Sequence, residues 1–523
     1  MTRAETLTVF LTSALALAAA SGYVLDLAGF GVSPVSVLLL SITGSAAHLW
    51  FAGSGRKAAI DLVAWVGVVS FVTAVLLRVA WPALLPPGRG PDLAHHLLLV
   101  DYIEHTGHLV HDRSLEGAMG EMAHYTPGAH LLAVLAGSWF GVDGLRAFYP
   151  LLMLCAALTA GFVFLIARRV LLPVPYAIAS VILLFLPSQY FHGGFTHDSF
   201  LAQAVATLFA VAAWWALVVW DDERSRSAAI SFSMFLVATF LTWPVFAGPM
   251  LIVFVAIARS TLPALLIGLG PFLAVVLIHS AGRWGWLGMV RTSGAVLRPG
   301  LDSVGWLLPL LTLIGLPIGV QDRRARVTIV LLLMIVLQAI TLFVIAKSQG
   351  ADTPYMAFKM VYLAIYPAAV VAAVAMAKVE SKVALGWLIA AALFLMAARP
   401  ALMAPRPVPI VSLDLYAAGK WTRANIGQTC VDYLVGEAET AYWLHLAVLG
   451  NPRGSERMLE MERYQPRAAV GPWITAEGRS YAIADLRLLP DEVRSRVDIV
   501  RTFGTAAVIK RADVMMGDCD LGR

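Results

Sequence analysis

Residues 143–169, DGLRAFYPLLMLCAALTAGFVFLIARR, combine a long apolar run with two arginines at its end. The run up to residue 167 is long enough to cross the hydrocarbon core of a bilayer as a single helix. Arg168 and Arg169 follow it directly, a pattern typical of a loop on the cytoplasmic side. The stretch therefore predicts a membrane-spanning helix and its direction.

The composition of the 523-residue chain is that of a polytopic membrane protein. Hydrophobic residues make up 59% and charged residues 14%, and the mean hydropathy is +0.77. A water-soluble globule of this size does not show that balance. Cytoplasmic loops explain the net charge of +5, and no basic tract interleaved with aromatic residues indicates a nucleic-acid partner.

Apolar stretches of spanning length recur along the chain and predict about thirteen transmembrane helices. The first resembles a signal peptide, but it is too long for one and lacks a clear cleavage site, so we expect a retained helix. The stretches lie at about 7–28, 33–52, 58–81, 143–167, 170–189, 199–220, 227–242, 244–259, 261–280, 302–319, 327–346, 360–377 and 383–398.

Threading these helices alternately assigns each loop to one side of the membrane. With a cytoplasmic N-terminus, nearly every short inner loop carries Lys or Arg, as in QDRRAR at 321–326. We therefore expect a multi-pass protein of a bacterial inner (plasma) membrane with an extracytoplasmic C-terminal domain. The expected parts are three transmembrane helices at 1–81, an extracytoplasmic acidic and His-rich loop at 82–142, the remaining helices at 143–399 and a soluble α/β domain at 400–523.

Two segments outside the spanning helices have recognisable patterns. GAHLLAVLAGSWFG at 128–141 is too short to span and ends in aromatic residues, which favours an amphipathic helix in the outer interface. The tail alternates period-2 fragments, TCVDYLV and TAAVIK, with the helical run EAETAYWLHLAVL, so we expect a small α/β domain there. In that domain Cys430 and Cys519 could pair, whereas Cys155 lies in an apolar run and is expected to be inert packing.

The segment 90–113, GPDLAHHLLLVDYIEHTGHLVHDR, concentrates ionisable residues in an otherwise apolar chain. On a helix that begins near Pro91, Asp92 and His96 are four residues apart and share a face with His95. A carboxylate beside an imidazole is a reasonable general base, so Asp92 and His96 are candidate catalytic residues and His95 a candidate substrate contact. Capping of the helix by Asp92 is the structural alternative, and both roles can coexist.

The rest of this segment raises the question of a metal. No pair of its histidines has the pattern of a zinc motif, whereas Asp92 with a second carboxylate is a candidate site for Mg²⁺ or Mn²⁺. We expect residues 105–112 to be the solvated part of the loop. In the next outer loop, His197 and Asp198 either cap the helix that follows or contact a sugar or a metal.

Two further outer loops carry basic and aromatic residues. KSQGADTPYMAFKM places Lys347, Tyr355 and Lys359 at the outer interface. Two explanations are open for the lysines: they neutralise a phosphate, or they snorkel to lipid headgroups. RWGWLGMVRTSGAVLRP adds Arg283 and Arg291, and arginine binds phosphate with bidentate geometry. All five residues are candidate substrate contacts.

PDLAHHLLLVDYIEHTGHL at 91–109 and HYTPGAHLLAVLAGSWFGVDGLRAFYPLLMLCAALTAGFVFLIARR at 124–169 resemble the GT-C superfamily of integral-membrane glycosyltransferases. The resemblance covers about the first 170 residues in pattern and the rest in architecture. It implies that Asp92 activates an acceptor hydroxyl, that the donor is a polyprenyl-phosphate sugar, and that Lys347 and Lys359 hold the donor phosphate. Two extra helices before the acidic loop depart from the simplest family plan.

The sequence therefore predicts glycosyl transfer from a polyprenyl-phosphate donor to a hydroxyl of a cell-envelope glycan, lipid or protein, with Asp92 as general base. A transporter or flippase of lipid-linked sugars is one alternative, which would need ionisable residues deep within several helices; Asp61, Arg78 and His279 are the few candidates. A non-catalytic envelope scaffold is the other.

Overall fold

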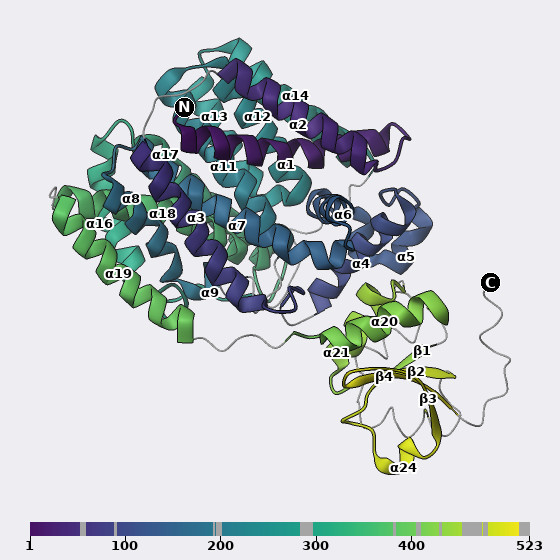
Figure 1. The fold of residues 1–523 in the computed structure, drawn as a ribbon. Helices are drawn as coiled ribbons and strands as arrows, with labels where there is room; N and C mark the ends of the chain where they lie inside the picture. Colours follow the sequence, from purple (N-terminus) through teal and green to yellow (C-terminus); the bar gives the residue numbers. More distant parts are fainter. Residues whose placement is uncertain are drawn as a thin grey trace.

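The structure, a computed structural model, consists of a helical bundle and a small C-terminal domain (Figure 1). It describes residues 1–52, 59–87, 91–191, 194, 201–282, 296–379, 383–403, 409–427, 431–451, 473 and 480–511. The prediction of a polytopic helical membrane protein with a small sheet near the C-terminus is confirmed.

Eight helices of the described chain are long and apolar enough to cross a membrane. They are α1 (Arg3–Leu27), α2 (Pro34–Ala52), α3 (Ala59–Ala80), α7 (Gly144–Arg169), α11 (Leu201–Glu223), α14 (Leu262–Gly282), α17 (Arg326–Ser348) and α18 (Tyr355–Val379). Other apolar helices complete the bundle: α8 (Val174–Ile182) with the 3₁₀ turn η3 (Leu183–Phe185), α12 (Arg226–Thr242), α13 (Ala247–Ala258) after η4 (Pro244–Phe246), α16 (Leu307–Gln321) and α19 (Val383–Met403).

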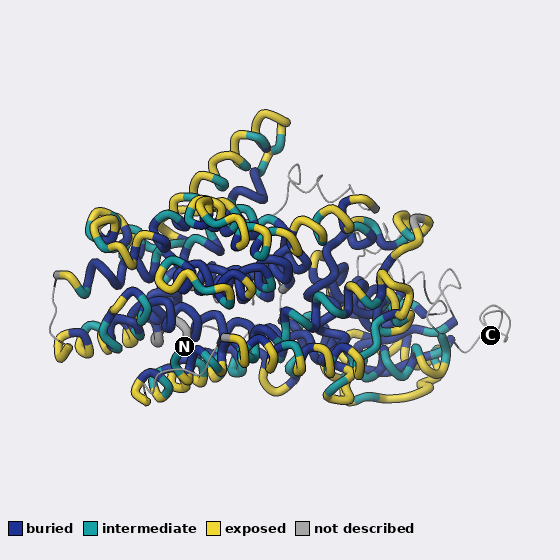
Figure 2. The backbone as a smooth tube through the Cα atoms, turned by 90° about the horizontal axis from the view of Figure 1, so that it is seen from above, coloured by how far each residue is buried: buried dark blue, intermediate teal, exposed yellow. Residues whose placement is uncertain are grey.

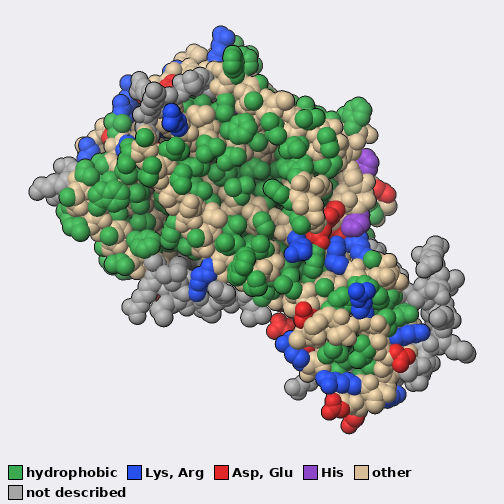
Figure 3. Space-filling model, in the orientation of Figure 1, with side chains coloured by type: hydrophobic (Ala, Val, Ile, Leu, Met, Phe, Trp, Pro, Cys, Tyr) green, Lys and Arg blue, Asp and Glu red, His purple; other side chains and the backbone are tan. Residues whose placement is uncertain are grey.

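The bundle buries its central helices and exposes apolar side chains around them. The most apolar 18-residue windows of α7 and α11 are 83% and 94% buried, whereas that of α14 is 22% buried. Figure 2 shows the same contrast between a buried interior and exposed outer helices. Apolar side chains dominate the bundle surface in Figure 3, while charges gather on the C-terminal domain and at one edge of the bundle. Such an apolar surface suits a lipid environment.

Ion pairs gather four helix ends at what we call the inner end of the bundle. Arg169 Nε lies 2.6 Å from Glu5 Oε1 and its Nη1 lies 2.7 Å from Glu223 Oε1, while Arg168 Nε lies 2.8 Å from Asp61 Oδ1. The pairs join the starts of α1 and α3 to the last turns of α7 and α11. Asp61, named above as a candidate deep ionisable residue, therefore lies in the first turn of its helix.

The opposite, outer end carries the acidic loop. It contains α4 (Pro91–Thr106), η1 (Arg113–Leu115), α5 (Glu116–Met119), η2 (Gly120–His124) and α6 (Gly128–Phe140). The helix predicted at 128–141 is present as α6, but it is not amphipathic, because residues 128–137 are all buried. Neighbouring helices α1, α4 and α7 pack around α6, so its apolar face meets protein.

The C-terminal domain is a four-stranded sheet of order β1-β2-β4-β3 with helices packed against it. β1 (Val431–Leu434) runs parallel to β2 (Tyr481–Asp485), and β4 (Ala506–Arg511) is antiparallel to β2 and β3 (Val497–Phe503). The helical elements of the domain are α20 (Leu413–Asn425), α21 (Ala438–Trp443), the π turn η6 (Leu444–Val448) and α24 (Asp491–Arg494). Two further short helices, α9 (Ser188–Phe191) and α15 (Leu301–Val304), belong to the bundle and not to this domain. The fragments TCVDYLV and TAAVIK contain β1 and β4, as their period predicts.

Polar contacts join this domain to the outer end. Arg423 of α20 forms a two-point ion pair with Asp101 of α4, with Nη2 3.1 Å from Oδ2. Lys420 Nζ lies 3.3 Å from Asp143, which also accepts a hydrogen bond from Tyr416. Figure 1 shows α20 and α21 facing α4 and α5. The domain is therefore fastened to the helix that carries the candidate base.

Candidate active site

Helix α4 positions the candidate base and both neighbouring histidines. Pro91 is its first residue, where the missing amide hydrogen costs nothing, and Asp92 lies in the first turn, where the helix dipole favours a carboxylate. Leu97, Leu98 and Leu99 are all buried and fix the helix against the bundle. The Asp92 side chain is exposed at the outer end. A carboxylate is thus presented to solvent from a helix that cannot easily move.

His95 connects three separate parts of the chain. Its Nδ1 lies 2.6 Å from Glu121 Oε1 of η2, and its Nε2 lies 2.5 Å from the Tyr442 hydroxyl of α21. Both ring nitrogens therefore have partners, and His95 is 4% exposed. These two hydrogen bonds fix the imidazole plane and bring the C-terminal domain to the candidate site.

His96 belongs to a buried aromatic and imidazole cluster. Its Nδ1 lies 3.0 Å from His130 Nε2 of α6, and the two rings stack at 5.2 Å between centroids. The Tyr125 ring stands edge-on to both. Burial lowers the pKa of both imidazoles, so a neutral pair sharing one hydrogen bond is the stable form at neutral pH.

Lys359, on the first turns of α18, lies in a cage of aromatic rings. Its Nζ lies 4.8 Å from the Tyr355 ring centroid, 5.8 Å from that of Tyr362 and 5.9 Å from that of Trp243. The residue is 1% exposed. Snorkelling into lipid headgroups does not describe this lysine, because its side chain is enclosed by protein. The rings stabilise the ammonium through cation–π interactions.

The lysine cage and the histidine cluster are adjacent. The rings of Tyr125 and Trp243 lie 5.8 Å apart, and Trp243 is where α12 ends before Pro244. After the dominant effect of burial, Asp92 and Glu121 raise the pKa of His96 while His95 and Lys359 lower it. We call this set the outer cluster: Asp92, His95, His96, Glu121, Tyr125, His130, Trp243, Tyr355 and Lys359.

Three buried polar atoms of the outer cluster lack hydrogen-bond partners in the part of the chain that the structure describes. They are His130 Nδ1 and two donors nearer Lys359, the Tyr125 hydroxyl and the indole Nε1 of Trp243. A buried donor without an acceptor costs free energy, and such atoms often mark places where a polar ligand supplies the acceptor. Both donors lie between the imidazole pair and Lys359.

The remaining predicted site residues fall in other places. Lys347 is exposed at the end of α17 and donates to the carbonyl oxygens of Ala351 and Asp352, at 3.2 and 2.7 Å, so it closes its own loop. The structure gives this lysine no place in the outer cluster. His197, Asp198, Arg283 and Arg291 lie outside the described residues, as do Cys430 and Cys519. Cys155 is fully buried, as expected for packing.

The histidines after α4 have a structural role as well as contact with solvent. His108 Nδ1 and His111 Nε2 lie 3.0 and 2.5 Å from the two carboxylate oxygens of Asp26, whose side chain is completely buried at the end of α1. Both histidines are therefore partners of a buried carboxylate, while their own side chains remain 52% and 45% exposed, in agreement with the prediction of a solvated segment. Among the described residues, no group of three or more His, Cys, Asp or Glu is arranged to hold a metal ion. Within the described ranges, Asp92 therefore does not belong to a group of residues arranged to coordinate a metal ion.

Four members of the outer cluster and one residue beside it were not assigned a site role from the sequence. Glu121, Tyr125, His130 and Trp243, with the neighbouring Tyr442, come from four separate segments and meet only in the fold. The sequence does carry two signals: His130 interrupts an apolar run, and Trp243 precedes a proline that breaks a helix.

The chain has the fold of the GT-C membrane glycosyltransferases. The crystal structure of ArnT from Cupriavidus metallidurans bound to undecaprenyl phosphate matches 88% of this chain and 100% of its own at 14% identity, with a TM-score of 0.51. The apo oligosaccharyltransferase of Archaeoglobus fulgidus matches 81% and 70%, at 13% identity and a TM-score of 0.49. No protein-family model and no curated protein sequence matches the chain.

Proposed function

We propose that this protein transfers a sugar from a polyprenyl-phosphate carrier to a hydroxyl of a cell-envelope glycan, lipid or protein at the outer membrane face. One observation carries the proposal: at one end of a bundle with the GT-C fold, an exposed carboxylate, Asp92, and a caged lysine, Lys359, lie near the same buried imidazole, His96. A membrane-embedded carrier also explains a site at the bilayer surface. ArnT was crystallised with such a carrier, undecaprenyl phosphate.

In the proposed reaction, Asp92 accepts the proton of the acceptor hydroxyl while that oxygen attacks the anomeric carbon. The bond between the anomeric carbon and the phosphate oxygen breaks, and the phosphate leaves with the electron pair. Lys359 stabilises the phosphate charge that develops. The Tyr125 hydroxyl and Trp243 Nε1 are donors for the phosphate or the sugar.

The other residues of the outer cluster act in this proposal by positioning. The His96–His130 pair supports the face of α4 that carries Asp92, and the bonds of His95 to Glu121 and Tyr442 hold the same helix from the other side. His197, Asp198, Arg283 and Arg291 remain proposed substrate contacts of the neighbouring loops. The proposal places the protein in the inner (plasma) membrane of a bacterium, with the outer cluster facing away from the cytoplasm.

The decisive assay compares Asp92→Asn with wild type on a synthetic polyprenyl-phosphate sugar. Asparagine has nearly the size of aspartate and can still accept a hydrogen bond, but it is not a base, so the variant tests proton acceptance with little change of shape. We expect turnover to fall by about 10²- to 10⁴-fold, the usual contribution of a general base. Asp112→Asn is the matched control, because Asp112 is exposed on the same loop and its hydrogen bonds among the described residues are to the nearby Ser114.

Two outcomes of the assay would count against the proposal, and a third measurement tests a metal requirement. Equal turnover in Asp92→Asn and wild type contradicts the role of Asp92 as base. Absence of transfer by wild type with every polyprenyl-phosphate sugar favours a flippase or an envelope scaffold instead. Adding a chelator to the same assay tests a requirement for Mg²⁺ or Mn²⁺, and unchanged turnover contradicts that requirement.

A further inference from the structure

A cavity of about 680 Å³ opens at the inner end of the bundle, far from the outer cluster. It lies between the last turns of α11 and α13 and the first turns of α14 and α17. α17 runs 23 residues from Arg326 at this cavity to Ser348 at the outer end, a helix about 34 Å long. The cavity and the outer cluster therefore serve opposite membrane surfaces.

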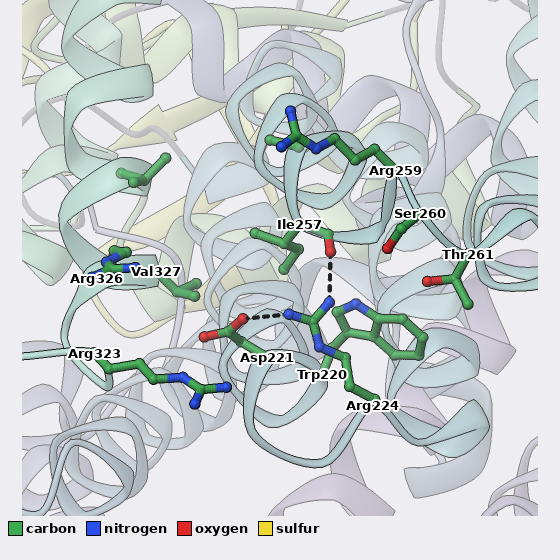
Figure 4. A pocket seen from close by; sticks show the side chains of 12 residues that line it. Trp220, Asp221, Arg224, Ile257, Arg259, Ser260, Thr261, Arg323, Arg326 and Val327 are labelled. Carbon is green, nitrogen blue, oxygen red and sulfur yellow. Dashed lines mark hydrogen bonds and ion pairs between the residues drawn. The ribbon is translucent and has the colours of Figure 1, made fainter.

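Four arginines and one aspartate line the cavity (Figure 4). Arg224 is held in place: it pairs with Asp221 at 2.9 Å, donates to the Ile257 carbonyl at 2.6 Å and lies over the Trp220 ring. The other three arginines, Arg259, Arg323 and Arg326, have no ion pair or side-chain hydrogen bond within the described ranges. The cavity thus carries a net positive charge that the described chain does not neutralise.

The arrangement of these arginines fits a phosphate group. Arg259 follows the end of α13, whereas Arg323 lies in the turn before α17 and Arg326 is the first residue of α17. Figure 4 shows Arg259 above Trp220 and Arg224, and Arg323 and Arg326 to their left. Ser260 and Thr261, which follow Arg259, add hydroxyls to the cavity lining. A guanidinium group binds phosphate oxygens through two parallel hydrogen bonds, so arginines from two separate loops suit a phosphate group.

The apolar lining distinguishes a lipid from a soluble phosphate. Val327 and Val330 face the cavity from α17, and α17 continues with Leu333 and Leu337, which are 48% and 51% exposed. On the neighbouring α13, Ile252 and Val255 are exposed in the same way. An apolar surface therefore leads from the cavity along both helices, where acyl chains would lie.

We propose that the inner-end cavity binds the phosphate headgroup of an anionic phospholipid of the adjoining leaflet. Basic pockets between transmembrane helices are known recognition sites for such headgroups. The ligand is distinct from the carrier proposed for the outer cluster, and its binding does not depend on the transfer reaction. The site anchors α11, α13 and α17 to the inner leaflet.

The test is a lipid titration of the purified full-length protein in detergent, followed by native mass spectrometry. We expect phosphatidylglycerol to bind, and the double variant Arg323→Gln/Arg326→Gln to weaken its affinity about tenfold or more. Arg324→Gln is the matched control, because Arg324 lies on the same turn but does not line the cavity. Its affinity should stay within about twofold of wild type.

Several results would overturn the proposal. Unchanged affinity in the double variant, or an equal loss in Arg324→Gln, contradicts the assignment to this cavity. Displacement of the lipid by an equal concentration of glycerol 3-phosphate would mean that a soluble phosphate is the ligand. If the double variant does not elute as a folded protein in size-exclusion chromatography, Arg259→Gln tests the same cavity from another loop and should weaken phosphatidylglycerol binding too.

Discussion

The outer end of the bundle and the inner-end cavity handle ionisable residues in opposite ways. At the outer end, buried carboxylates have matched partners: Asp101 has Arg423, and Asp26 has His108 and His111. At the inner-end cavity, Arg259, Arg323 and Arg326 are exposed around an open space. Buried ionisable groups need exact partners, whereas exposed arginines need only a counter-charge. The outer end is therefore built for fixed geometry and the inner-end cavity for electrostatic attraction.

After Asp92→Asn, the largest expected effect separates two lysines that the sequence treats alike. Lys359→Gln removes the caged charge, and we expect kcat/KM with the polyprenyl-phosphate donor to fall about a hundredfold, or about 2.7 kcal/mol of transition-state stabilisation. Lys347→Gln should change it less than about twofold, because that lysine bonds only its own loop. Equal losses of kcat/KM in the two variants would contradict a special role for the caged Lys359 over the exposed Lys347.

The next effect concerns the attachment of the C-terminal domain. Arg423→Ala leaves Asp101 buried without its cation, and we expect a loss of about 2 kcal/mol in the stability of that attachment. Limited proteolysis should release the domain faster in this variant than in wild type. Lys420→Ala is the control, because Asp143 keeps its bond to Tyr416. Equal release in both variants would mean that Asp101 does not hold the domain.

Acid should weaken the outer end and leave the arginines of the inner end charged. Burial lowers the pKa of His96 and His130, and lowers that of His445 to about 4. The unfolded chain, with ordinary imidazoles, then binds more protons below about pH 6.5, so stability falls as the pH drops from 6.5 towards 4. Between pH 7.5 and 5.5 we expect about 1 kcal/mol per imidazole.

Thermal unfolding at the two pH values measures this effect. His445→Gln removes one titrating group while keeping a side chain that can bond Tyr433. Its stability should depend less on pH than that of wild type. An identical pH dependence in both proteins would contradict a buried neutral His445.

The smallest expected effect is that of Tyr442→Phe, which deletes the hydroxyl bonded to His95. The loss is about 1 kcal/mol, the net value of one hydrogen bond, and should appear as a fall in turnover of about fivefold. Tyr481→Phe, in the same domain on strand β2, is the control. An equal fall in turnover for Tyr481→Phe would show that Tyr442 affects turnover through the stability of the domain and not through its bond to His95.

The sequence predicts the bundle well and the site only in part. Long apolar windows are a strong signal, and α7 contains all of the predicted span 143–167 except its first residue, the N-cap Asp143. Asp92 and His95 were found because helical spacing is a local property. Tyr442 was not, because it lies 347 residues from His95 in the chain and only folding joins them. The burial of α6 was missed for the same reason, since its neighbours come from α1, α4 and α7.

Local sequence patterns also fail to distinguish Lys347 from Lys359. Hydropathy and the side of the membrane are identical for Lys347 and Lys359, and only the aromatic rings from α12 and α18 distinguish them. The structure also gives the half-exposed His108 and His111 a partner that the sequence does not predict, Asp26 of the first helix. Local patterns predict which residues are unusual, whereas the fold decides which of them meet.

Photo-crosslinking with a polyprenyl phosphate that carries a reactive group beside its phosphate tests the central claim most directly. If the outer cluster is the donor site, labelled peptides should contain Trp243 or residues 355–362, and Lys359→Gln should reduce the labelling. Unlabelled carrier should compete, whereas phosphatidylglycerol should not. Labelling confined to the arginines of the inner-end cavity would contradict the account, because it would place the carrier at the opposite end of the bundle.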